Sequence, residues 1–367
     1  MRDTPLKNIL LISLPTFLLL FLVLEIMVRG LYPKVSLLEL TGRQPTENPM
    51  RAWARNDSYA AYSAIPGKYD EQKTVNTHGF ISTPEIKMEK DSNTTRMIFL
   101  GGSSTAGTGV NIADEKTWPW LTAEKLRAAS SGEIDFINAA LGGYSTFESY
   151  GKLWSQLRFY TPDIVIMYHG WNEMYYFNEI ADSPISWKKT FSVNGKTKME
   201  SLPPLAVDRY IAWSQLLTKV RVKLSRNTAL SGEYKLGENE PLKNDFNEKG
   251  LAIFRENLRL IQAFCEQYNI ELFVCKQATL ITSNTSETDR ERCHYEFHGF
   301  DHDAHVRAFE KIYEVIDQEV AENNIIDLTH LSGVSSHFYD HIHQTELGND
   351  LISDQVYQYL LRAVSEE

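Results

Sequence analysis

The sequence predicts an α/β fold in which helices cover both faces of a parallel sheet. Five short apolar runs with β-branched residues recur after residue 96, and stretches with helical spacing, such as 118–129 and 252–268, separate the first four. Alternating strands and helices form parallel sheets, and strands that are apolar throughout fit a sheet with both faces covered. The apolar runs are residues 97–100, 134–140, 163–168, 270–276 and 325–328.

The composition is that of a globular protein. The chain has 367 residues, of which 43% are hydrophobic and 23% charged, enough for one α/β domain with insertions. A net charge of -11 argues against a nucleic-acid partner, which would require clustered Lys and Arg. Three cysteines are too few for a disulfide scaffold, although one bridge could form.

An apolar segment, residues 9–28, lies near the N-terminus and contains one charged residue, Glu25. About 20 such residues can cross a hydrocarbon core of about 30 Å as a helix, and a membrane helix tolerates Pro15. A cleaved signal peptide would have a shorter apolar region and small residues at its cleavage site. We therefore predict an uncleaved single-pass anchor that follows a short tail, residues 1–8. A cleaved signal or a buried soluble helix are the alternatives.

The basic residues that flank this segment are nearly balanced, with Arg2 and Lys7 before it and Arg29 and Lys34 after it. The positive-inside rule therefore does not decide the orientation. Our expectation is that the bulk of the chain lies outside the cytoplasm, in the periplasm or the extracellular space.

Three further regions follow the anchor. Residues 29–90 are polar and irregular, and we predict a connector with a small β element around residues 75–80. Residues 91–367 are expected to form the α/β domain. A long insertion at about 180–248 interrupts this domain, and long insertions at strand ends often form lids. We predict that the insertion covers the site and sets its specificity.

The carboxyl ends of the strands should hold the functional residues, because ligands bind there in open parallel sheets. The first run is followed by Gly101-Gly102-Ser103-Ser104-Thr105. A phosphate-binding loop would need a lysine after the second glycine of G-x-x-x-x-G, and none follows Gly107; the dinucleotide fingerprint also fails. A nucleophilic serine is the remaining interpretation.

Such a serine needs a base, an acid that orients the base, and donors for an oxyanion. Asp340 and His343 stand three residues apart, so one turn could hold an imidazole beside a carboxylate. Gly143, after the second run, offers a backbone N–H, and Asn172, after the third, offers a side-chain amide. Each of these residues alone has a plainer interpretation as a cap, a turn or a solvated side chain. Their combination at the strand ends indicates a catalytic site.

These four blocks, in this order, resemble the SGNH (GDSL-type) hydrolase family. The resemblance spans roughly residues 75–367, and residues 75–80 resemble the segment that precedes the first block in membrane-anchored bacterial members. It implies a flavodoxin-like three-layer α/β/α sandwich, preceded here by one transmembrane helix. Carried over, Ser103 is the nucleophile, and Asp340 with His343 completes the catalytic triad. The resemblance places the oxyanion hole at Ser103, Gly143 and Asn172.

Three positions depart from the family pattern. Gly102 stands where the family often has Asp, Glu173 replaces a commoner aspartate, and Ala140 occupies a place that is often glycine. None of them removes a catalytic group, so the departures bear on the substrate rather than on activity.

A histidine-rich stretch lies between residues 293 and 305. Imidazoles at this density could hold zinc, but no C-x-x-C pair accompanies them, so we favour a loop at the pocket rim that contacts the substrate. No metal and no organic cofactor is expected. The residues are Cys293, His294, His298, His302 and His305.

The expected function is that of a membrane-anchored serine esterase that removes acyl groups, such as O-acetyl, from a glycan or lipid. Ser103 would attack the ester carbonyl, His343 would take its proton, and water would release the acyl group. If a sugar hydroxyl replaced water, the same site would be an O-acyltransferase acting on an envelope polysaccharide. A catalytically inactive domain that binds a glycan or a partner is a further alternative, which the intact Ser103, Asp340 and His343 disfavour.

Overall fold

A computed structural model of the protein describes residues 12–32, 34–40, 54–179, 192–193, 197–198, 205–228 and 241–365. The described residues fall into two compact units. The sheet unit comprises residues 54–179 and 241–365. The helical unit comprises the described residues up to 40 and those between 192 and 228.

The sheet unit is built on a parallel sheet that has all five predicted strands. In spatial order the strands are β11 (Ile325–Asp327), β10 (Glu271–Lys276), β7 (Ile164–His169), β5 (Thr94–Gly101) and β6 (Glu133–Asn138). This is the flavodoxin-like order, in which the second strand along the chain lies on one side of the first and the later strands lie on the other. The predicted fold class is confirmed.

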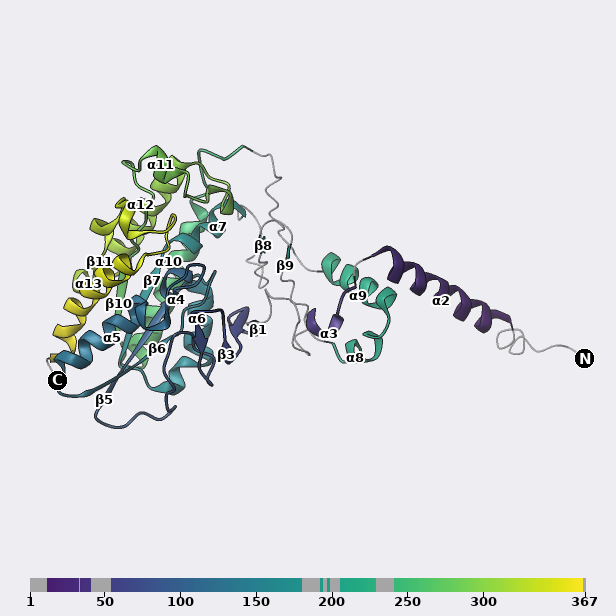
Figure 1. Ribbon diagram of the computed structural model, residues 1–367, viewed down its shortest axis with the longest axis horizontal. Coiled ribbons are helices and arrows are strands. Elements are labelled where there is room, and N and C mark those ends of the chain that lie inside the picture. The colour runs from purple at the N-terminus through teal and green to yellow at the C-terminus, as the bar shows by residue number, and fades with distance from the viewer. Residues whose placement is uncertain are drawn as a thin grey trace, which may run out of the picture. The chain divides into compact units, whose positions relative to one another are not determined.

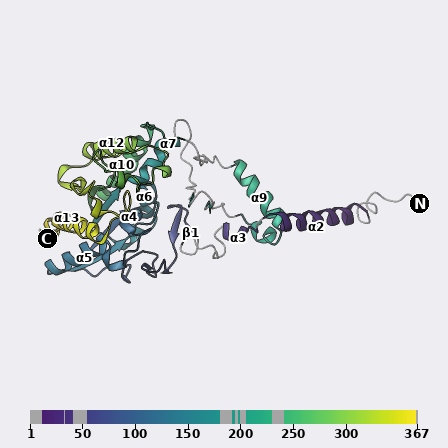
Figure 2. The same ribbon diagram turned by 45° about the horizontal axis from the view of Figure 1, so that its top comes forward.

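Helices cover the two faces of this sheet. On one side α5 (Trp118–Ala129) contacts α13 (Glu346–Ser365), and on the other α10 (Lys249–Gln267) contacts both α6 (Thr146–Ser155) and α12 (His302–Glu319) (Figures 1 and 2). The strands between them are almost fully buried, and β7 is buried at every position. The predicted helix at 118–129 matches α5, and the one at 252–268 matches most of α10.

The sheet unit begins earlier in the chain than predicted. Residues 54–90, expected to be a connector, form β1 (Ala54–Asn56), β2 (Tyr62–Ala64), β3 (Gly67–Lys68) and β4 (Thr74–Val75), which pair as two antiparallel ribbons. The boundary at residue 91 is wrong because Tyr62 and Phe80, both 1–2% exposed, are buried in this unit. The β element predicted at 75–80 is confined to Val75 and a bridge to Ile81, with a turn between them.

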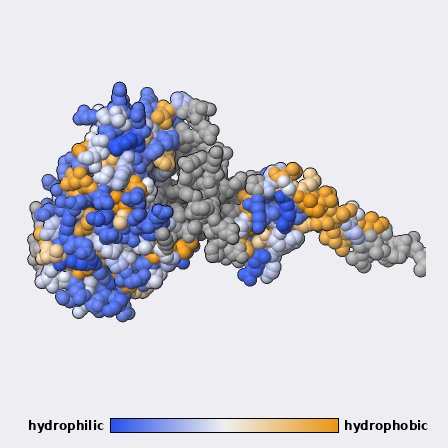
Figure 3. Space-filling model, in the orientation of Figure 1, coloured by the Kyte–Doolittle hydropathy of each residue, from blue (hydrophilic) through white to orange (hydrophobic). Residues whose placement is uncertain are grey.

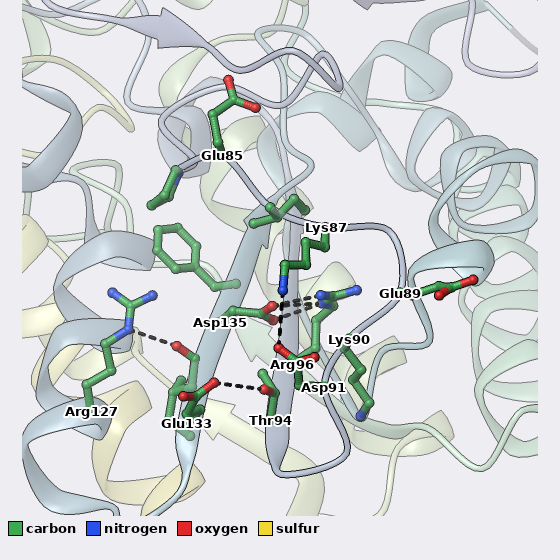
Figure 4. A pocket seen from close by; sticks show the side chains of 14 residues that line it. Glu85, Lys87, Glu89, Lys90, Asp91, Thr94, Arg96, Arg127, Glu133 and Asp135 are labelled. Carbon is green, nitrogen blue, oxygen red and sulfur yellow. Dashed lines mark hydrogen bonds and ion pairs between the residues drawn. The ribbon is translucent and has the colours of Figure 1, made fainter.

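A pocket opens at the amino-terminal ends of β5 and β6 (Figure 4). Its most buried charged group has partners within the protein: the Arg96 guanidinium pairs with Asp135 at 2.8 Å and donates to the carbonyls of Met88 and Tyr160. The length of β5, roughly 23 Å, separates this pocket from the carboxyl ends of the strands. We assign it no catalytic role.

The helical unit contains α2 (Leu14–Leu31), α3 (Leu37–Leu40), α8 (Asp208–Ile211), α9 (Gln215–Thr228) and the short strands β8 (Ser192–Val193) and β9 (Thr197–Lys198). Of the helices in the described part of the chain, α2 is the one long and apolar enough to cross a membrane. Its hydrophobic surface is visible in Figure 3. The helix extends three residues past the predicted end of the anchor, and residues 9–11 of that prediction lie outside the described residues. Residues 212–214 separate α8 from α9.

Residues 205–228 of the insertion belong to the helical unit, where α9 contacts α2, whereas residues 241–248 belong to the sheet unit. The rest of the insertion, apart from the two short strands and residues 241–248, lies outside the described residues. The lid therefore stays a prediction.

Candidate active site

The site lies at the point where the strand order reverses. Chain connections leave β5 toward β6 on one side and later return to β7 on the other. In open α/β sheets, ligands bind outside the carboxyl ends of the strands at such a point. Ser103 lies two residues after the end of β5, and Asn172 lies three residues after the end of β7. The topology thus brings the first and third sequence blocks together.

Ser103 is the first residue of a single-turn helix, α4 (Ser103–Ala106). Gly102, not Ser103, occupies the N-cap, and among the described residues the Ser103 hydroxyl caps no backbone group. The side chain is partly exposed, whereas Ser104 and Thr105 beside it are buried. The alternative interpretation of Ser103 as a helix cap therefore does not hold.

The two glycines before Ser103 are required by close contacts. A Cβ atom on Gly102 would lie 2.4 Å from Nδ2 of Asn172, and one on Gly101 would lie 2.1 Å from Oγ1 of Thr105. The Asn172 amide also donates to the carbonyl of Tyr144 at 2.8 Å. The departure from the family pattern at position 102 is thus explained, because the Asn172 amide occupies the space that a side chain would need.

Gly143 lies in the turn after β6 and has a φ of 79°, which glycine adopts without strain. Two hydrogen bonds connect this turn to strand β2 of the N-terminal ribbons. The Tyr62 hydroxyl donates to the carbonyl of Gly142 at 2.5 Å, and the Tyr144 hydroxyl donates to the carbonyl of Tyr62. The Gly142 carbonyl and the Gly143 N–H belong to the same peptide unit. Tyr62 therefore restrains the peptide that carries the predicted oxyanion donor.

Asp340 and His343 form the predicted pair. Nδ1 of His343 lies 2.7 Å from Oδ2 of Asp340, whose other oxygen accepts the backbone N–H groups of Ile342 and His343, each at 2.9 Å. Burial raises the pKa of Asp340, but these hydrogen bonds and the neighbouring imidazoles outweigh it and hold the pKa well below its usual range. The carboxylate is therefore ionised at neutral pH and can orient the imidazole.

The other ring nitrogen of His343, Nε2, is buried and has no hydrogen-bond partner among the described residues. The segment that carries it is tied to the serine block, since the Ser104 hydroxyl donates to the carbonyl of Ile342 at 3.2 Å. No hydrogen bond joins His343 to the Ser103 hydroxyl in the described structure. In an enzyme without substrate such a bond is often long and tightens when the substrate binds.

Glu173 ties the third block to the second. It is fully buried and accepts the backbone N–H of Thr146 at 2.7 Å and the Thr146 hydroxyl at 2.8 Å, at the start of α6. A carboxylate at a helix N-terminus is favoured by the helix dipole. This second departure from the family pattern therefore helps to fix the position of α6, which begins three residues after Gly143.

The histidine-rich loop lies beside the third block. The Trp171 ring contacts the rings of His298, His305 and His341, with centroids 4.2, 5.1 and 4.0 Å away. Burial lowers the pKa of His305 to about 4 and that of His341 well below its usual range. The imidazoles of His305 and His341 are therefore uncharged at neutral pH. Together with His298 they form an aromatic wall against Trp171, the residue before Asn172.

Most of these histidines already use their ring nitrogens. His298 bonds to His305, and His302 bonds to the Tyr295 hydroxyl and to the carbonyl of Thr282. In the described part of the chain, the group with a spacing suited to a metal is His294, Asp340 and His341. Since Asp340 is engaged by His343, a metal there would compete with the predicted Asp340–His343 pair, and we assign none.

Two residues of the site are absent from the sequence prediction. Gln277, the first residue after β10, accepts the backbone N–H of Trp171 at 2.7 Å and contacts the Ser104 hydroxyl at 3.4 Å. Its place at a strand end was a usable signal. Tyr62 carried no such signal, because it belongs to a segment predicted to be a connector.

No protein-family model matches the chain, and no curated protein sequence matches it either. Several solved structures are similar to this chain. An acetyl xylan esterase is 15% identical, over 72% of this chain and 98% of that one, with a TM-score of 0.40. A lipase/acylhydrolase from Enterococcus faecalis is 14% identical, over 72% and 95%, with a TM-score of 0.41. A psychrotrophic esterase from Pseudoalteromonas sp. is 14% identical, over 75% and 100%, with a TM-score of 0.39. These values are too low to assign an activity, which is inferred below from the side chains of the site.

Proposed function

We propose that this protein is a membrane-anchored serine esterase that hydrolyses acyl esters of a glycan or lipid. The observation that carries the proposal is the Asp340–His343 pair. Nε2 of His343 is buried, has no partner among the described residues, and lies on a segment bonded to the residue after Ser103. The opposite ring nitrogen, Nδ1, is held by a carboxylate at 2.7 Å. A general base keeps one nitrogen for the nucleophile.

The chemistry follows the order of these groups. Nε2 of His343 takes the Ser103 proton as the hydroxyl oxygen attacks the ester carbonyl, and the N–H groups of Ser103 and Gly143 with the Asn172 amide stabilise the oxyanion. The tetrahedral intermediate collapses, His343 protonates the leaving alcohol, and an acyl-serine remains. Water, deprotonated by His343, then releases the acid and restores Ser103. An acceptor hydroxyl in place of water would give acyl transfer through the same intermediate.

The proposal includes the anchor and its orientation. The α2 helix is long and apolar enough to cross a membrane, and we place the sheet unit outside the cytoplasm. The anchor predicts that full-length protein resists carbonate extraction from membranes. The orientation predicts that protease added to intact spheroplasts digests the sheet unit.

The catalytic proposal is tested by a fluorophosphonate probe on full-length protein and two variants. Ser103→Ala should abolish both labelling and the hydrolysis of p-nitrophenyl acetate, while Ser336→Ala, an exposed serine on the segment before Asp340, should leave both unchanged. Labelling that persists in Ser103→Ala, or folded wild-type protein with neither labelling nor hydrolysis, would refute the proposal.

A further inference from the structure

Helices α8 and α9 form a small assembly with the anchor helix. The Trp213 ring lies 6.0 Å from the Phe21 ring of α2, and the Arg29 guanidinium donates to the Trp213 carbonyl at 2.7 Å. The Gln215 side chain exchanges two hydrogen bonds with the backbone of Val35, at 2.8 and 2.9 Å. These contacts join chain segments about 180 residues apart, so the insertion is built onto the anchor itself.

Glu25 is the centre of this assembly. It is 5% exposed and accepts the backbone N–H groups of Gln215 and Leu216, at 2.8 and 2.9 Å, and the hydroxyl of Ser214 at 2.7 Å. The first N–H groups of a helix have no partner within it, and a carboxylate satisfies them with favourable charge. The single charged residue of the predicted membrane segment is therefore matched by the N-terminus of α9.

The outer surface of this assembly has the character of a membrane interface. Tyr210 and Trp213 are 69% and 63% exposed, and Leu205 and Val207 beside them are nearly half exposed. Residues 205–228 contain five basic residues and one acidic residue, although the whole chain carries a net charge of -11. Exposed Trp and Tyr next to a transmembrane helix, with basic residues close by, are typical of the headgroup region.

The depth of the contact agrees with this placement. Phe21 lies one helical turn before Glu25, about 6 Å along the axis of α2. Because Trp213 contacts Phe21, it lies about one helical turn closer to the membrane centre than the polar contacts of Glu25 do. This distance agrees with the depth, about 5–10 Å, to which an interfacial helix buries its apolar face. The exposed apolar side chains of α2 continue this surface.

We propose that residues 205–228 are seated in the headgroup region of the membrane and bind a bilayer that contains acidic phospholipid. The surface formed by Leu205, Val207, Tyr210 and Trp213 contacts the acyl boundary, and the exposed basic side chains of Arg209 and Lys223 contact the phosphates. Arg221 is not part of this contact, because it is buried and pairs with Asp208 at 3.0 Å. This inference rests on the anchor in the proposed function. It assigns the insertion a lipid partner in addition to any role as a lid.

The test uses full-length protein in vesicles of phosphatidylethanolamine and radiolabelled phosphatidylglycerol, with the photo-crosslinker benzoylphenylalanine at one position at a time. Leu18, an exposed residue of α2, is the positive control, and Phe159, an exposed aromatic residue of the sheet unit, is the negative control. We expect crosslinking of phosphatidylglycerol at Tyr210 and Trp213 to approach that at Leu18 and to exceed that at Phe159 about tenfold.

Two outcomes would overturn the inference and differ from each other. In the first outcome, lipid adducts form at Leu18, but those at Tyr210 and Trp213 are no more abundant than at Phe159. This result would support the anchor and refute the membrane contact of the insertion. A protein–protein adduct at Tyr210 in that case would identify the sheet unit or a second copy as the occupant. Absence of lipid adducts at Leu18 would overturn the anchor and this inference together.

Discussion

At the scale of single residues, the candidate site is contacted by a tyrosine that lies outside the four predicted blocks. The Tyr62 hydroxyl bonds to the carbonyl oxygen of the peptide whose N–H belongs to Gly143. A hydrogen bond to the carbonyl of a peptide polarises its N–H and holds its direction. We therefore expect Tyr62 to be a positioning residue, which acts on the proposed oxyanion donor Gly143 without contacting the substrate.

The substitution Tyr62→Phe removes this hydroxyl and keeps the ring, which is buried against Tyr144. We expect kcat for p-nitrophenyl acetate to fall about tenfold, less than for direct loss of an oxyanion donor, with KM little changed. Tyr59→Phe, at an exposed tyrosine, is the control. An unchanged kcat, or a rise in KM with kcat preserved, would contradict this role.

At the scale of elements, the N-terminal ribbons are attached to α6 through a buried lysine. Lys152 is 5% exposed, donates to the Ser63 hydroxyl at 2.8 Å and to Gln156 at 2.7 Å, and lies 4.0 Å from Asp57. Burial lowers the pKa of Lys152 to about 8 despite the nearby Asp57. The folded state therefore disfavours the protonated form, which the unfolded chain retains up to about pH 10.4.

This shift predicts a pH dependence of a definite sign. Above pH 8 the unfolded state binds more protons at Lys152 than the folded state does, so the free energy of unfolding rises with pH. From pH 8 to 9.5 wild-type protein should gain about 1.5 kcal/mol relative to Lys152→Met, because other titrating groups are common to both. Urea unfolding at both pH values measures the difference. A difference that is constant with pH would show that Lys152 is solvated.

At the scale of the whole molecule, the chain consists of two units, and the sheet unit holds all five predicted site residues. Removal of residues 1–51 and replacement of residues 186–233 by a Gly-Ser linker should therefore leave a protein that unfolds cooperatively and is labelled at Ser103. A variant that lacks only residues 1–51 is the control. An aggregated product would contradict the independence of the sheet unit.

The same pair of variants tests the predicted lid. If the insertion covers the site, its replacement should change the preference between p-nitrophenyl acetate and p-nitrophenyl octanoate, while the control retains the wild-type preference. Equal preference in both variants would exclude a lid that selects the acyl group. The membrane contact of residues 205–228 does not depend on this outcome.

The five strands and the four blocks at their ends can be read from the sequence, because a strand buried on both faces needs a continuous apolar run and its end needs a turn. Asp340 and His343 were predictable as a pair for a similar reason, since they are near neighbours in the chain.

Contacts between distant residues were decided only by the tertiary structure. Three hydrogen bonds of the site join positions 27 to 106 residues apart, and no local pattern encodes such contacts. They link Tyr62 with Gly142, Glu173 with Thr146, and Gln277 with Trp171. Glu25 is the clearest case. In the sequence it is a charge that interrupts an apolar segment, whereas in the fold it binds the N-terminus of a helix about 190 residues further along the chain.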